Sequence, residues 1–77
     1  MTTLLDVPEG QCARLAAQAG RLRTRLMQVG LYTGDEVRVV RSAPLGGPVL
    51  VEVNGREIAL GRAVAEKVQV ELPCVSP

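Results

Sequence analysis

The sequence has no histidine, tryptophan or phenylalanine, and Tyr32 is its only aromatic residue. Histidine is the usual general base of enzymes near neutral pH, so its absence removes the commonest way of activating a nucleophile. Ser42 and Ser76 therefore have no base to activate them, and Cys12 has no histidine partner. The glycine pair Gly46-Gly47 lies between prolines and lacks the following lysine of a phosphate-binding loop. We predict that the protein is not an enzyme.

The shortage of aromatic residues and of net charge excludes several binding functions. Grooves for proline-rich peptides are lined by aromatic rings, and single-stranded nucleic acids stack on them. Nine basic and eight acidic residues leave a net charge of +1. A nucleic-acid binder or a protein held on anionic lipid normally carries a stronger basic surface. We therefore expect neither nucleic acid nor a lipid surface as a partner.

Long apolar runs and signal sequences are also missing. No run approaches the roughly 18–20 apolar residues of a membrane helix, so no direct membrane insertion is expected. The first residues lack a basic flank followed by an apolar segment, which predicts a cytoplasmic protein. Two cysteines are too few for a disulfide-rich secreted scaffold. The chain of 77 residues predicts a single domain over residues 1–72, with a flexible tail over 73–77.

The stretch 22–35 contains the only convincing amphipathic helix of the sequence, together with its stop. The apolar residues at the spacing of one helix face are Ala19, Leu22, Leu26 and Val29. Gly20 predicts a break before the helix. Gly30 stands where a left-handed residue ends a helix, and Leu31 is placed to fold back on the last turn.

The rest of the sequence predicts short strands and turns. The predicted strands are 11–17, 35–41, 49–53, 56–60 and 67–72, with a helix over the first of these as an alternative. Asn54-Gly55 predicts a tight hairpin between the third and fourth strands. Short helical turns are expected over 3–7 and 61–66. Five short strands in so small a chain must curl to protect their edges, so we predict a mainly β, α+β fold: a small SH3-like five-stranded barrel with one main helix.

Several motifs in a fixed order resemble those of the FeoA family of bacterial ferrous iron transport. They are Leu5 with Pro8-Glu9-Gly10, the stretch 25–34, the loop 43–48, the segment 58–65 and the final Val68-Gln69-Val70. The positions that match the family signature are Leu26, Gly30, Leu31, Gly34, Pro44, Gly46 and Pro48. Thr33, Gly47 and Gly61 depart from the family pattern, which has proline, an acidic residue and arginine there. These departures loosen turns or remove a charge, which Arg62 partly restores, and do not disturb the fold.

The resemblance implies a partner rather than a reaction. FeoA-like proteins are thought to act beside FeoB, a membrane ferrous iron transporter with a cytosolic GTP-binding domain. The resemblance therefore implies a non-catalytic accessory that binds the cytosolic region of FeoB at the inner membrane and modulates it. Diphtheria-toxin-repressor-type regulators carry the same fold as a C-terminal domain, so a metal-responsive regulatory module is the alternative. A third hypothesis is a structural module that forms a weak homodimer through strand edges.

No cofactor is expected, and the residues offer only a few ligands for a metal. Iron(II) favours imidazole and carboxylate ligands, and the sequence has no imidazole. Cys12 and Cys74 lie in the first strand and after the last, and terminal strands pair in such barrels. With Glu71 they are candidate ligands for weak or adventitious zinc. The alternative is that Cys12 is a small, half-buried apolar residue and Cys74 has no role.

Two exposed regions are candidate partner-binding surfaces. The helix carries Arg21, Arg23 and Arg25, which form either a docking face for an acidic partner or an ordinary solvated face. Arg25 has the further alternative of pairing with a carboxylate of the fold. Tyr32 lies on the same stretch, just beyond the stop. In the loop 43–48, Leu45 either contacts a partner or folds back over the barrel end.

Overall fold

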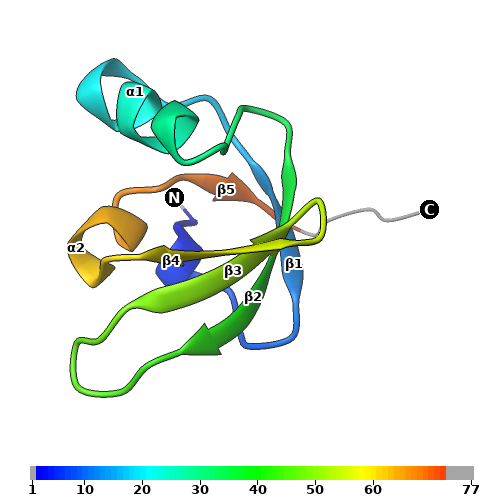
Figure 1. The fold of residues 1–77 in the computed structure, drawn as a ribbon, viewed down its shortest axis with the longest axis vertical. Coiled ribbons are helices and arrows are strands. Elements are labelled where there is room, and N and C mark those ends of the chain that lie inside the picture. Colours follow the sequence, from blue (N-terminus) through cyan, green and yellow to red (C-terminus); the bar gives the residue numbers. More distant parts are fainter. Residues whose placement is uncertain (1, 73–77) are drawn as a thin grey trace.

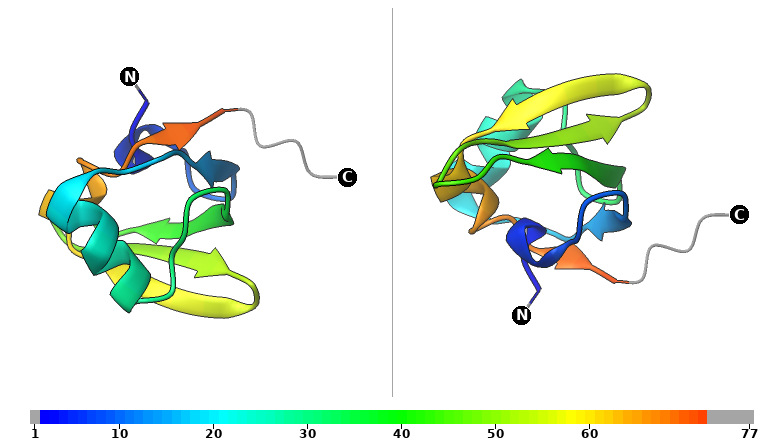
Figure 2. Two further views of the ribbon diagram at one scale, coloured as in Figure 1. Left: turned by 90° about the horizontal axis from the view of Figure 1, so that it is seen from above. Right: turned by 90° about the horizontal axis from the view of Figure 1, so that it is seen from below.

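The computed structural model describes residues 2–72. Its elements in chain order are the 3₁₀ helix η1 (Leu4–Asp6), β1 (Cys12–Leu15), α1 (Gly20–Gln28), β2 (Glu36–Ser42), β3 (Val49–Val53), β4 (Arg56–Leu60), α2 (Arg62–Ala65) and β5 (Val70–Glu71). The strands form one five-stranded antiparallel sheet in the order β4-β3-β2-β1-β5. The sheet curls, so that β5 lies across the core from β3 and β4 (Figure 2).

The core of this barrel is entirely aliphatic. Its buried residues are Leu4, Val7, Ala13, Leu15, Leu26, Leu31, Val37, Val39, Val49, Val51, Val53, Leu60, Ala65, Val68 and Val70. Most come from alternate strand positions, as in β3, where Val49, Val51 and Val53 are buried and the residues between them are not. This alternation confirms the strands predicted over 35–41 and 49–53, because one sheet face must be covered while the other meets water.

The first strand is β1, shorter than predicted. Its inward residues Ala13 and Leu15 are buried, although alanine alone favours a helix. Cys12 pairs with Arg38 of β2, while Arg14 pairs with Glu71 of β5. A position between two neighbouring strands supplies the backbone hydrogen bonds that a helix would supply internally. The helical alternative for this segment is therefore wrong.

The main helix α1 covers one end of the barrel (Figure 1). It begins at Gly20, which has φ +63°, so the predicted break lies inside the first turn. Leu26 is buried and Leu22 is half-buried against the core, but Val29 is 42% exposed. The prediction of one continuous apolar face was therefore wrong at its ends. Ala19 has an extended backbone, and Val29 is the C-cap where the helical path stops.

The predicted stop at Gly30 is confirmed as a Schellman motif. Gly30 has φ +90°, and its N–H donates to the Met27 carbonyl at 3.1 Å. The Leu31 N–H donates to the Leu26 carbonyl at 2.8 Å, which brings the Leu31 side chain into the core. A second turn follows at Gly34, whose N–H donates to the Leu15 carbonyl at 2.8 Å. These contacts attach the end of α1 to the barrel.

The predicted hairpin is present, whereas the last strand is much shorter than expected. Asn54 and Gly55 have φ values of +51° and +79°, which suit the tight turn between β3 and β4. The last strand was predicted over 67–72, but β5 comprises only Val70–Glu71. The Lys67 N–H donates to the Val64 carbonyl and the Val68 N–H to the Ala65 carbonyl. These bonds prolong the α2 turn, which leaves fewer backbone groups for pairing in a strand.

Candidate partner-binding surfaces

One of the hollows that border α1 lies between α1 and α2. It is a cleft of about 210 Å³, lined by Arg21, Leu22, Arg25, Ala63, Val64 and Lys67, which we call the α1–α2 cleft. Arg21 and Arg25 are four residues apart and therefore project from the same side of the helix. Leu22 and Val64 are partly buried against the core and form an apolar floor.

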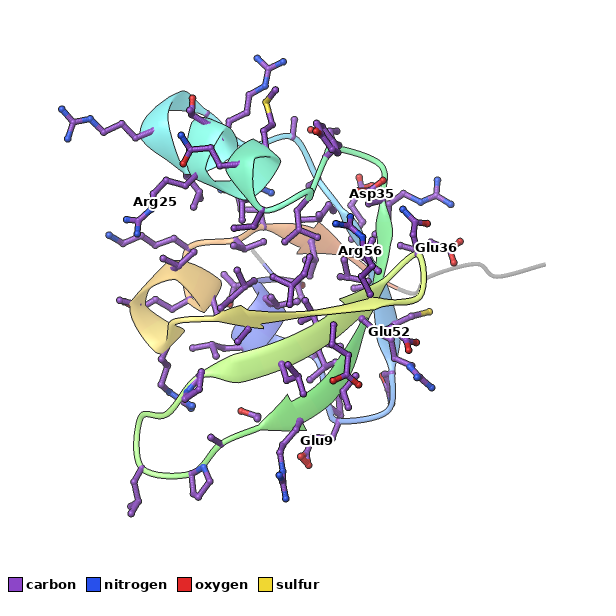
Figure 3. The ribbon with its side chains drawn as sticks, viewed as in Figure 1. Glu9, Arg25, Asp35, Glu36, Glu52 and Arg56 are labelled. Carbon is purple, nitrogen blue, oxygen red and sulfur yellow. The ribbon has the colours of Figure 1, made fainter. Side chains whose placement is uncertain are left out.

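The charges around the α1–α2 cleft are all positive. Arg21, Arg25 and Lys67 line it, and no aspartate or glutamate does. The Arg25 side chain lies between α1 and α2 (Figure 3). Within residues 2–72 the ion pair formed is Arg38 with Glu52, at 2.8 Å, so Arg25 does not pair with a carboxylate there. Arg21 and Arg25 thus lie together as predicted. Lys67, far along the sequence, was missed because only the fold brings it there.

The second hollow is a groove of about 220 Å³ on another side of α1. It is lined by Leu15, Ala16, Gln18, Arg23, Leu26, Met27, Leu31, Tyr32 and Thr33. Tyr32 is 51% exposed and Met27 42% exposed. The Gln18 amide donates to the Gln69 carbonyl at 2.8 Å, which holds the segment before α1 near the start of β5. Tyr32 is therefore not in the same hollow as Arg21 and Arg25. Met27 was not among the predicted contact residues, because the turn after α1 is what brings Tyr32 beside the same groove.

The loop between β2 and β3 presents Leu45 fully to solvent. Leu45 is 102% exposed and has φ +59°, so the alternative in which it folds back over the barrel end is wrong. The turn is closed by the Gly47 N–H, which donates to the Pro44 carbonyl at 3.2 Å. This loop lies at the opposite end of the domain from α1 (Figure 1). The five predicted partner-binding residues therefore occupy three separate surfaces: Arg21 and Arg25 lie in the cleft, Arg23 and Tyr32 in the groove, and Leu45 on the loop.

The structure describes two of the three predicted metal ligands, Cys12 and Glu71. Cys74 lies outside the described residues, and Cys12 is half-buried in β1. Glu71 pairs across the sheet with Arg14 rather than with Cys12. Within residues 2–72 no three cysteine, aspartate or glutamate side chains gather in a geometry that holds a metal.

The hollow around Cys12 is a poor cation site. Glu36 and Glu52 line it, but so does Arg38, whose guanidinium pairs with Glu52. A positive charge in the hollow opposes a second cation by direct repulsion. The described donors therefore do not fit a resident metal.

Within residues 2–72, no helix has the length and apolar character to span a bilayer.

Known proteins are similar to this chain in sequence and in fold. Residues 2–72 match the FeoA domain family. A putative Fe(2+) transport protein A of Methanocaldococcus jannaschii is 38% identical over 47 residues, which cover 61% of this chain and 55% of that protein. An Fe(2+) transport protein A/Fe(2+) transporter FeoB fusion protein of Porphyromonas gingivalis is 32% identical over 71 residues. That match covers 90% of this chain and 8% of the fusion protein, so the chain spans only part of either relative's length.

A solved structure connects the fold to the same family. The crystal structure of Stenotrophomonas maltophilia FeoA complexed with zinc superposes with a TM-score of 0.71 at 31% identity. The superposition covers 92% of this chain and 91% of that one, and its description is a prokaryotic SH3 domain protein. This confirms the predicted SH3-like barrel.

FeoA domains are non-catalytic, which confirms the prediction that the chain is not an enzyme. Since the family match includes every described residue, the chain belongs to the FeoA family.

Proposed function

We propose that this chain is a cytoplasmic accessory of ferrous iron uptake that binds the cytosolic region of a FeoB-type transporter and modulates its activity. The similarity to the Porphyromonas gingivalis fusion protein carries this proposal, because there an FeoA-like part and a FeoB transporter belong to one polypeptide. Covalent linkage raises the effective concentration of two parts that act together. A separate FeoA-like chain must provide the same association through its surface.

The described surface supports an interaction rather than a reaction. Hollows of about 210, 220 and 580 Å³ border α1, and none of the residues that line them is a histidine, cysteine, aspartate or glutamate that could act as a general base. Side chains of a protein partner fit such hollows, with the exposed Met27 and Tyr32 beside one and three cations beside another. The proposed role needs no bound cofactor.

Binding to a purified transporter tests this function. Detergent-solubilised FeoB is immobilised, and binding of this chain is measured by biolayer interferometry without nucleotide, with GDP and with a non-hydrolysable GTP analogue. Saturable binding in at least one nucleotide state is expected. An unrelated GTP-binding membrane protein in the same detergent is the control. Absence of binding in all three states would contradict the proposal. GTP hydrolysis measured in parallel then shows whether the bound accessory modulates the transporter.

The regulatory module and the weak homodimer stay predictions. Sedimentation-velocity ultracentrifugation over a range of concentrations tests the homodimer, because self-association through the β4 or β5 edge must rise with concentration. A concentration-independent monomer would exclude it.

A further inference from the structure

The α1–α2 cleft concentrates positive charge in a domain that is nearly neutral. Three cations line it without a carboxylate, although the whole chain has a net charge of only +1. Arg21 and Arg25 form a like-charge pair four residues apart, which costs a few tenths of a kcal/mol in an isolated helix. Lys67 from beyond α2 adds a third positive charge to the same cleft. Within residues 2–72 none of these three side chains forms an ion pair or a hydrogen bond that would offset the repulsion.

We propose that the α1–α2 cleft is the docking site for an acidic segment of the protein partner. An aliphatic side chain of that segment rests on the floor made by Leu22, Ala63 and Val64. Its flanking carboxylates accept hydrogen bonds from Arg21, Arg25 and Lys67. The identity of the partner rests on the proposed function, whereas the chemistry of the segment follows from the cleft itself.

The mixed lining of the cleft selects this occupant over others. Leu22 and Val64 are only partly buried, so an aliphatic side chain placed on them removes further apolar surface from water. A free inorganic anion would leave this floor exposed. Arginine presents a planar fork of donors that matches a carboxylate in two parallel hydrogen bonds. The cleft therefore suits a segment in which acidic and aliphatic residues alternate.

A nucleic acid or a lipid surface fits the molecule less well. Both are extended polyanions that bind basic surfaces much broader than one cleft. The basic residues that line this cleft are three, from α1 and from the turn after α2, and acidic residues elsewhere nearly balance the chain. An acidic protein segment needs only a local cluster of this size. Binding to anionic vesicles is kept as an outcome of the test.

Charge reversal on both walls of the cleft tests the proposal with the transporter. The variant R25E/K67E reverses one cation on each wall. The matched control R41E/R56E has the same net charge but changes two exposed residues outside the cleft and the groove. We expect R25E/K67E to weaken binding to solubilised FeoB by about tenfold or more, and the control to stay within about twofold of the unaltered chain. Equal loss in both variants, or loss in the control alone, would overturn the proposal. Far-UV circular dichroism confirms that each variant is folded.

A synthetic peptide tests the cleft independently of the transporter. The probe is an acidic peptide of alternating glutamate pairs and leucines, and its control has lysine in place of glutamate. In ¹⁵N-resolved NMR titrations we expect the acidic peptide to shift the amide signals of Leu22, Val64 and Lys67 in the unaltered chain but not in R25E/K67E. Shifts confined to other residues, or equal shifts with the lysine peptide, would overturn the proposal. Binding to phosphatidylserine vesicles that R25E/K67E abolishes, without peptide binding, would also overturn it.

The two experiments separate this inference from the proposed function. If solubilised FeoB fails to bind while the acidic peptide occupies the cleft, the proposed function is wrong and the docking chemistry stands. If FeoB binds equally to the unaltered chain and to R25E/K67E, the proposed function stands and the docking site is wrong.

Discussion

Replacement of Gly30 by alanine tests how α1 ends. Gly30 has φ +90° and joins the helix to Leu31, which is buried in the core. An L-residue in left-handed conformation costs about 1–2 kcal/mol, because its Cβ comes too close to the neighbouring carbonyl oxygen. A Cβ built on Gly30 lies 2.7 Å from Nη2 of Arg56. That contact adds little, because Arg56 is exposed and its guanidinium can move away at the loss of a long 3.5 Å hydrogen bond to the Gly30 carbonyl.

The expected loss in the free energy of unfolding is therefore about 1–2 kcal/mol, set by the backbone rather than by the contact with Arg56. In a domain of this size such a loss lowers Tm by about 4–16 °C. Urea denaturation followed by far-UV circular dichroism measures it. Gly61→Ala is the matched control, since Gly61 has φ −59° and nothing lies within 4 Å of its added Cβ. This control is expected to change the free energy of unfolding by less than about 0.5 kcal/mol.

The double variant G30A/R56A separates the backbone cost from the steric cost. If left-handed strain dominates, removal of the Arg56 side chain restores little stability. Full recovery in G30A/R56A would refute the reasoning and show that the guanidinium, not the backbone, opposes a side chain at this position. A G30A variant as stable as the unaltered chain would refute the assigned helix stop.

Four other variants, one of them a control, test the core, the exposed loop and the cysteine. Val51 is fully buried, so Val51→Ala should lower the free energy of unfolding by about 2–3 kcal/mol in urea denaturation, while Val29→Ala at the exposed helix end should cost less than about 0.5 kcal/mol. Leu45 has φ +59° and no burial, so Leu45→Asn should raise stability by up to about 1 kcal/mol, and a loss would reveal a packing role. Because Arg38 lies in the hollow beside Cys12, Cys12→Ser should leave zinc affinity unchanged in competition with a chromophoric chelator, and a large loss would identify a thiol site.

Features governed by neighbouring residues could be predicted from the sequence. The alternation of Val37 and Val39 identified β2, and Asn54-Gly55 identified the hairpin, because both signals act within a few residues. Gly30 identified the helix stop for the same reason. The exposure of Val29 could not be predicted from helical spacing, because it depends on where the α1 axis ends relative to the barrel.

The candidate site was harder to predict because distant segments form it. The spacing of Arg21 and Arg25 placed them together, but nothing in the sequence indicated that Lys67 joins them across the α1–α2 cleft. The short β5 has a similar cause, since the backbone bonds of the α2 turn compete with those of the strand. Leu45 could not be assigned to core or surface, because its exposure depends on the turn that the loop adopts.

The position of the single aromatic ring makes tyrosine fluorescence a probe of the groove beside Met27. With no tryptophan or phenylalanine, Tyr32 is the only source of intrinsic near-ultraviolet fluorescence, and it lies half-exposed at the groove beside Met27. No ring lies in the core, so loss of the barrel interior changes this emission only indirectly. A ligand that enters the groove changes the Tyr32 emission directly, while a ligand in the α1–α2 cleft leaves that emission nearly unchanged. Tyrosine emission can therefore distinguish which side of α1 a partner occupies, without a label.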